Sequence, residues 1–170
     1  MTLNLILTRE VSGLGHPGTI SLVRRAASAA LKAEGVEEDC VLSVLLTDDE
    51  GIRRINREYR DLDRPTDVLS FPMNDLTAGK FDPSMCERDP DTGEILLGDM
   101  VLSIPRCEEQ GEEFGHGYDR EVQYLTVHSV LHLLGYDHVD EGAEKAAMRA
   151  VEEEVLAKLG LTRVEEGEEQ

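Results

Sequence analysis

Apolar and polar residues follow two different periods along this chain. Alternating or short continuous apolar runs predict four strands, over residues 3–8, 41–46, 67–71 and 95–103. Apolar residues spaced as on one helix face predict helices over residues 19–33, 48–59 and 119–134, a short one opening at Pro105, and a last one over residues 141–159. This order predicts a small mixed sheet with helices packed on it.

Single residues mark the ends of these elements. Asp48 or Asp49 can cap the second helix, and Asp119 can cap the helix that follows residue 118. Gly35 and Gly135 are expected to end the helices before them. Gly98, inside the fourth strand, indicates a bulge or a close backbone contact.

Two polar segments stand outside this pattern. Residues 73–93 are polar and broken by glycine and proline, and they predict a long loop or insertion. The terminal residues 161–170 are acidic and predict a disordered tail. We therefore expect a single domain over residues 1–160.

The composition suits a soluble cytoplasmic protein. Of 170 residues, 40% are apolar and 31% charged, and no run of 18 apolar residues predicts a membrane span. The N-terminus has no basic flank and too short an apolar stretch for a signal peptide. The three cysteines are odd in number and lack paired spacing, so we expect reduced thiols rather than disulfides or a thiolate zinc site.

The net charge of −19 argues against general affinity for nucleic acid. The charge is uneven, however, because five arginines fall between residues 53 and 64 against three acids. A local phosphate-binding face is compatible with that stretch. With three Phe, four Tyr and no Trp, no aromatic platform for stacking bases is evident.

Residues 128–138 read HSVLHLLGYDH and contain the strongest chemical signal. His128 and His132 lie one helical turn apart, so both imidazoles can face one ion. Gly135 can turn the chain back and bring His138 to the same place. Three imidazoles with one open position are typical of a catalytic zinc site, although nickel, cobalt and copper also accept imidazole. His16 and His116 lie beside glycines and are expected to be ordinary surface residues.

The spacing of these histidines is also that of metzincin peptidases. Those enzymes need glutamate directly after the first histidine as the general base, and this chain has Ser129 there. The substitution weakens the peptidase interpretation and leaves metal binding intact.

HSVLHLLGYDH resembles the signature H-G-x-L-H-L-x-G-Y-D-H of the YbeY family of bacterial rRNA maturation factors, with Ser129 in place of the usual glycine. Serine is small, so we expect local crowding rather than loss of function. Two further stretches are similar to family blocks: residues 56–72, with N-R-E-Y-R and then D-R-P-T-D-V-L-S-F-P, and residues 97–103, L-G-D-M-V-L-S.

The resemblance implies a zinc-dependent endoribonuclease that acts on single-stranded RNA, in 16S rRNA 3′-end maturation and ribosome quality control. It implies an α+β fold, with a small mixed four-stranded sheet, about five helices, and the metal site on a central helix and the turn after it. The family's metal histidines map onto His128, His132 and His138, and its functional arginine onto Arg60. Implied partners are the 16S rRNA precursor, the ribosome or its small-subunit proteins, and a ribosome-associated GTPase.

Several residues receive roles on this hypothesis. Arg60 contacts the scissile phosphate, and Asp137 or Asp140 orients a ligand histidine. The block Pro65-Thr66-Asp67 is expected to be structural, through bonds to nearby backbone. A solvated helix face is expected for the remaining arginines, Arg53, Arg54 and Arg57.

Two other functions stay open at this point. One is a zinc metallopeptidase. The other is a ribosome-associated protein without catalysis, in which the histidines hold a structural zinc. A structural site usually has four protein ligands, and the nearest preceding cysteine, Cys107, lies 21 residues before His128.

Overall fold

The computed structural model describes residues 1–137 and 142–161 of the chain. Within them the elements follow the predicted order and confirm the α+β class. They are β1 (Leu3–Arg9), α1 (Thr19–Ala33), β2 (Cys40–Thr47), α2 (Asp49–Arg60), β3 (Val68–Pro72), a short 3-10 turn η1 (Pro83–Met85), β4 (Ile95–Ser103), α3 (Ile104–Glu113), α4 (Gly117–Leu133) and α5 (Ala143–Lys158).

The four strands form one mixed sheet in the order β1-β2-β4-β3. β1, β2 and β4 run parallel, whereas β3 runs antiparallel to β4 and forms one edge of the sheet. The carbonyl of Asp67 and the amide of Met73 bond to β4 at the two ends of β3. Because backbone groups alternate along a strand, those of Ser70 point to the free edge.

Gly98 is the site of the expected irregularity in β4. The register between β2 and β4 shifts between Val41 and Leu42, opposite Gly98. Gly98 has φ 130°, and a Cβ there would lie 2.3 Å from the Phe71 carbonyl oxygen. A side chain at this position would therefore push β3 away from β4.

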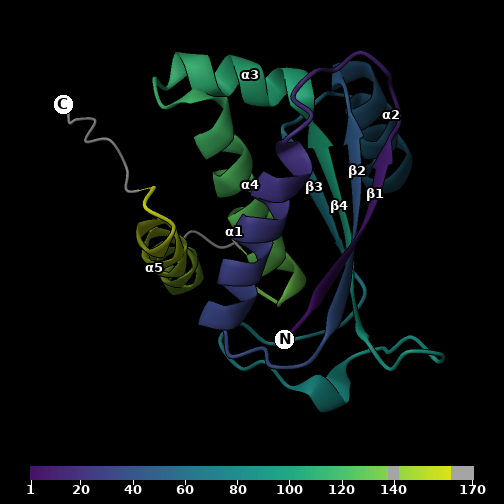
Figure 1. Cartoon of the computed structure of the whole chain (residues 1–170), viewed down its shortest axis with the longest axis vertical. Helices are drawn as coiled ribbons and strands as arrows, with labels where there is room; N and C mark the ends of the chain where they lie inside the picture. Colours follow the sequence, from purple (N-terminus) through teal and green to yellow (C-terminus); the bar gives the residue numbers. More distant parts are fainter. Residues whose placement is uncertain (138–141, 162–170) are drawn as a thin grey trace.

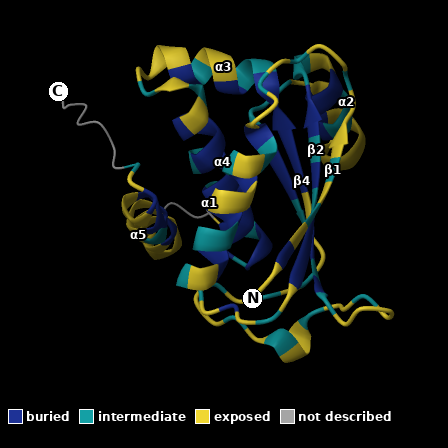
Figure 2. Cartoon of the chain, viewed as in Figure 1, coloured by how far each residue is buried: buried dark blue, intermediate teal, exposed yellow. Residues whose placement is uncertain are grey.

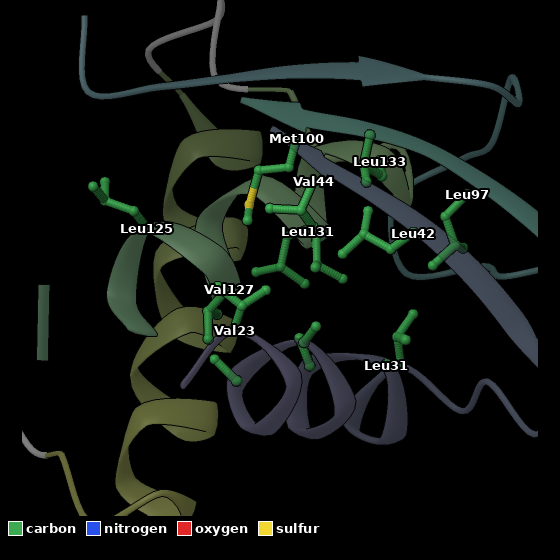
Figure 3. Packing of buried hydrophobic residues seen from close by; sticks show 14 of the residues in the cluster. Val23, Leu31, Leu42, Val44, Leu97, Met100, Leu125, Val127, Leu131 and Leu133 are labelled. Carbon is green, nitrogen blue, oxygen red and sulfur yellow. The ribbon is translucent and has the colours of Figure 1, made fainter. Parts of the chain in front are cut away.

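Helices cover the sheet unequally (Figure 1). α1 and α4 pack together over one face with α5 outside them, and α2 covers the other face. Figure 3 shows the main core between α1, α4 and the sheet, where buried side chains point toward one another: Val23, Leu31, Leu42, Val44, Leu97, Met100, Leu125, Val127, Leu131 and Leu133. Buried residues concentrate on these elements, and exposed ones lie on the outward faces of α1 and α5 (Figure 2). The core under α2 is much smaller, with Ile52, Leu69 and Val101.

The predicted N-cap residue of α2 is confirmed, and that of α4 is wrong. Asp48 caps α2, since its carboxylate accepts the Gly51 amide at 2.9 Å. α4 begins earlier than expected: His116 is its N-cap residue and Asp119 lies in the first turn, so the Asp119 cap was wrong. A carboxylate in that turn still interacts favourably with the helix dipole.

The predicted loop over residues 73–93 contains η1 and the isolated bridge Thr77–Lys80, and its Arg88 forms a second isolated bridge to Ile95 of β4. The loop extends beyond one end of the sheet (Figure 1). Leu161, assigned to the tail from the sequence, still packs against the core. The rest of the predicted tail lies outside the described residues. In the described part of the chain, no helix is both long and apolar enough to span a membrane.

Candidate functional site

A cleft of about 750 Å³ opens beside the free edge of β3. The end of α2 and the segment after it form one wall, and the end of α4 forms the other. β3 and the residues that follow it lie between these walls. The side chains that matter for chemistry are Arg60, Arg64, Asp67, His128, His132, Tyr136 and Asp137.

His128 and His132 lie together in this cleft, as their spacing predicts. Their rings meet edge to face with centroids 4.7 Å apart, and their Nε2 atoms are 3.2 Å from each other. The third predicted ligand, His138, lies outside the described residues. The described part of the chain alone contains no cluster of three metal-binding side chains.

The 3.2 Å separation fits a shared ion. Two nitrogens bound to one tetrahedral zinc at about 2.0–2.1 Å lie about 3.3 Å apart. Both histidines present the same type of nitrogen, Nε2, to this point. The pair therefore suits a metal held from one side, with the cleft on the other.

Glu152 explains how His128 presents Nε2. Its carboxylate Oε2 lies 2.5 Å from Nδ1 of His128, and Glu152 is only 5% exposed. An ionised carboxylate accepts a hydrogen bond from Nδ1 when that nitrogen carries the ring proton. In this tautomer Nε2 is the nitrogen with the lone pair that a metal would bind. Sequence analysis missed this residue, which lies 24 positions away on α5.

The end of α4 depends on Gly135. The amide of Gly135 bonds to the His132 carbonyl and that of Tyr136 to Leu131, both at 3.0 Å. Gly135 has φ 106°, and a Cβ there would lie 2.4 Å from the carbonyl oxygen of Leu76. The glycine therefore both ends the helix and lets the chain after β3 pass close to the histidine pair.

Ser129 does not face the cleft. It is fully buried, and its Oγ lies 2.6 Å from Oγ of Ser70 on β3. The crowding that we expected at this position is replaced by a hydrogen bond that joins α4 to the edge strand β3. A buried, hydrogen-bonded hydroxyl cannot serve as a general base at neutral pH.

Arg60 forms part of the opposite wall. Its guanidinium donates to the Ser70 carbonyl at 3.4 Å and lies over the Phe71 ring, 5.8 Å from the centroid. Arg64 also lines the cleft. Among the residues that the structure describes, no carboxylate forms an ion pair with either arginine, so both can receive an anion.

The other arginines of α2 pair with acids, as a solvated helix face should. Arg53 donates to Asp63 at 2.8 Å, and Arg57 lies 3.8 Å from the same carboxylate. Arg54 pairs with Glu10. The Arg53 hydrogen bond holds the pKa of Asp63 below its usual value.

Asp67 has the expected structural role. Its Oδ1 accepts the Val68 amide at 2.7 Å, and its Oδ2 accepts from Gln110 at 3.3 Å. Asp137 lines the cleft, while Asp140 lies outside the described residues. Burial raises the pKa of Tyr136 to about 12, with Glu34 adding to the shift, so its hydroxyl stays protonated at neutral pH.

Neither remaining histidine is an ordinary surface residue. The side chain of His116 is only 13% exposed and bonds to the buried Glu121 at 2.6 Å, so that expectation was wrong. His16 stacks on Tyr118 with centroids 3.7 Å apart and bonds to Glu108 at 2.5 Å. Both residues fix loops against helices away from the cleft.

The cysteines are free thiols, as expected, and none of them lines the cleft. Cys40 and Cys107 are fully buried. Burial, with smaller contributions from nearby acids, raises the pKa of Cys40 to about 12 and that of Cys107 further still. None of these thiols is placed to supply a fourth metal ligand.

Comparisons with known proteins show the fold and the family of this chain. The solution structure of a Thermotoga maritima protein is similar in fold, with a TM-score of 0.53 and 23% identity over 94% of this chain and 92% of that one. Endoribonuclease YbeY of Clostridium botulinum strain 657 is 48% identical over 147 residues, 83% of this chain and 88% of the relative. Endoribonuclease YbeY of Clostridium perfringens strain ATCC 13124 is 52% identical over 146 residues, 80% of this chain and 84% of the relative. The family model described as Endoribonuclease YbeY matches residues 12–160, and the chain therefore belongs to the YbeY family.

Proposed function

We propose that this protein is a zinc-dependent endoribonuclease that cuts single-stranded RNA. Its proposed role is in 16S rRNA 3′-end maturation and ribosome quality control, in the cytoplasm. Membership of a family named for endoribonuclease activity supports the reaction class. The proposed partners are the 16S rRNA precursor, the ribosome or its small-subunit proteins, and a ribosome-associated GTPase.

One observation carries the proposal: the histidine pair and two arginines, which form no ion pair with any described carboxylate, share one cleft. His128 and His132 direct Nε2 atoms toward a common point, and Arg60 lies in the opposite wall. A phosphodiester needs both a group that activates water and a cation that balances charge on the phosphate. The net charge of −19 leaves such a local arrangement as the means of holding RNA.

In this mechanism His128, His132 and, by family resemblance, His138 hold the ion. A bound divalent ion would supply Lewis acidity and a water of lowered pKa. Glu152 keeps the proton of His128 on Nδ1, so Nε2 is available for the metal. Arg60 binds the scissile phosphate with its planar guanidinium and stabilises the charge that develops there.

Three observations favour this function over the alternatives. Ser129, at the position of the metzincin glutamate, is buried against Ser70 and cannot act on a substrate. The free edge of β3, where an extended peptide would add, has the Ser70 carbonyl occupied by Arg60. Against a structural zinc, no cysteine lines the cleft to complete a closed ligand set.

The decisive experiment measures bound zinc and RNA cleavage in the same preparations. Wild type should carry about one zinc per chain and cut a labelled single-stranded RNA. His132→Ala should lose most of its bound zinc and most of its RNA cleavage. Arg60→Ala should keep the zinc and lose about 100-fold or more in kcat/KM, because it removes a charge contact to the transition state.

A matched control is Arg54→Ala, because Arg54 lies on the same helix but pairs with Glu10 and does not line the cleft. It should keep both zinc and activity. If wild type binds zinc but leaves RNA intact, even with ribosomal particles present, the nuclease proposal is wrong. An unstructured peptide library in the same assay tests the peptidase alternative.

A further inference from the structure

An exposed aromatic ring lies beside Arg60, on the outer side of the cleft wall. Tyr59, in the last turn of α2, is 72% exposed, more than any other large apolar or aromatic side chain of the described residues. It does not line the cleft itself. Leaving so much aromatic surface in water has a free-energy cost, which a ligand that covers the ring would recover.

The Tyr59 ring contacts one neighbouring ring. It meets the ring of Phe71 edge to face, with centroids 5.7 Å apart and planes at 64°. Phe71 in turn carries the Arg60 guanidinium, 5.8 Å from its centroid. We call Tyr59, Phe71 and Arg60 the aromatic shelf.

The shelf continues the cleft over the edge strand. Phe71 and Ser70 are neighbours on β3, and side chains alternate between the two faces of a strand. Ser70 points toward α4, where it bonds to Ser129, and Phe71 packs under α2. Arg60 contacts both residues, so it connects the cleft to the shelf.

We propose that the aromatic shelf is a base-binding subsite, in which one unpaired base of single-stranded RNA stacks on Tyr59. This inference rests on the proposed function. The phosphate next to that base is held by Arg60 at the cleft, because the Tyr59 ring and the Arg60 guanidinium both contact the Phe71 ring. Stacking on a ring requires an unstacked base, so the shelf selects single-stranded over duplex RNA.

A second exposed aromatic provides the contrast. Phe114, at the end of α3, is 56% exposed, but it follows Glu112 and Glu113 directly in sequence. Carboxylates repel a phosphate backbone, whereas Arg60 attracts it. Tyr59 also follows an acid, Glu58, but it lies next to Arg60 in a stretch with five arginines against three acids, whereas Phe114 follows two acids.

The absence of tryptophan from the chain allows a direct test. Tyr59→Trp introduces a single tryptophan, which can still stack and can be excited selectively over the tyrosines, and Phe114→Trp does the same at the control position. Each variant is mixed with a single-stranded RNA oligonucleotide in a stopped-flow instrument, so that binding is read before cleavage. We expect RNA to quench Trp fluorescence at position 59 and to leave position 114 unchanged.

Affinity provides the second readout. Tyr59→Ala should weaken binding roughly 5- to 150-fold, as loss of one stacked base predicts, while Tyr59→Phe should bind like wild type. Oligonucleotides with one abasic position, moved along the strand, should reveal a single position where wild type loses the same factor. At that position Tyr59→Ala should cause no further loss, because both changes remove the same contact. Tyr59 is exposed, so an unchanged urea midpoint should show that the fold is intact.

The outcomes separate this inference from the proposed function. If wild type cuts RNA and Tyr59→Ala binds and cuts it equally well, the shelf is not a subsite and the nuclease proposal stands. If both tryptophan positions respond alike to RNA, the contact is nonspecific and the shelf is again refuted. If wild type neither binds nor cuts single-stranded RNA, the function fails and the shelf with it.

Discussion

The two walls of the cleft differ in how the fold holds them. The wall with the histidines belongs to α4, in which eleven of seventeen residues are buried, and Glu152 and Ser70 contact it from other elements. The wall with Arg60 belongs to α2, in which only three of twelve residues are buried. Around it lie exposed ion pairs such as Arg53–Asp63.

This difference matches the demands of the two proposed tasks, metal binding at α4 and phosphate binding at α2. The proposed metal ligands would need positions fixed to a few tenths of an ångström, and the buried neighbours of α4 would provide that restraint. A phosphate contact by a long guanidinium tolerates small movements of its helix. We therefore expect substitutions near α4 to change stability and metal affinity, and Arg60→Ala on α2 to weaken RNA binding and cleavage while zinc binding is kept.

The largest effect should come from breaking the α4 wall at Gly135. Gly135→Ala places a Cβ against the Leu76 carbonyl and forces alanine into a positive φ. We expect a loss of about 2–4 kcal/mol in the free energy of unfolding, measured by urea denaturation. Gly93→Ala is the control, since Gly93 also has positive φ but a Cβ there would meet nothing within 4 Å. An equal loss in both variants would mean that close packing at Gly135 contributes nothing.

A smaller effect sharpens the comparison at Glu152. Glu152→Gln keeps the shape of the side chain but removes the charge that favours a protonated Nδ1 on His128. We expect zinc affinity to fall about 10- to 100-fold, measured by competition with a chromogenic chelator. Glu154→Gln, an exposed residue of α5 paired with Lys158, should bind zinc like wild type. Unchanged affinity in Glu152→Gln would show that the hydrogen bond does not tune the metal site.

The smallest effect should come from the ion pairs beside Arg60. Arg53 lowers the pKa of Asp63 below its ordinary value of 3.8. The pair therefore stabilises the fold at pH values above 3.8, and this contribution is lost as the pH falls through the lowered pKa. Both groups are exposed and screened by solvent, so Asp63→Asn should leave the urea midpoint at pH 7 within error of wild type. A clear loss at pH 7 that disappears at pH 3 would show that the α2 wall depends on this pair.

Local patterns in the sequence predicted most of the fold. Helix α1 begins and ends where its apolar spacing indicated, and Gly98 marks the expected irregularity. The pairing of His128 with His132 also followed from spacing alone, because one helical turn brings them together. Arg60 came from the family resemblance, and the structure places it in the same cleft.

Contacts between distant elements could not be predicted in this way. Glu152 is one of three consecutive glutamates, and only the packing of α5 on α4 decides which of them turns inward. His116 looked exposed because it lies between glycines, yet Glu121 is buried one turn into the same helix and binds it. The exposure of the Tyr59 ring depends on the packing around α2, which among the described elements covers its face of the sheet alone and over a small core.

The free edge of β3 has a further consequence, for self-association. An open strand edge invites strands of other molecules to add to the sheet, which leads to aggregation. Here Arg60 occupies the Ser70 carbonyl at this edge, and Pro72 has no amide hydrogen to offer. The same arginine that we assign to RNA would thus keep neighbouring copies of the protein apart at high concentration.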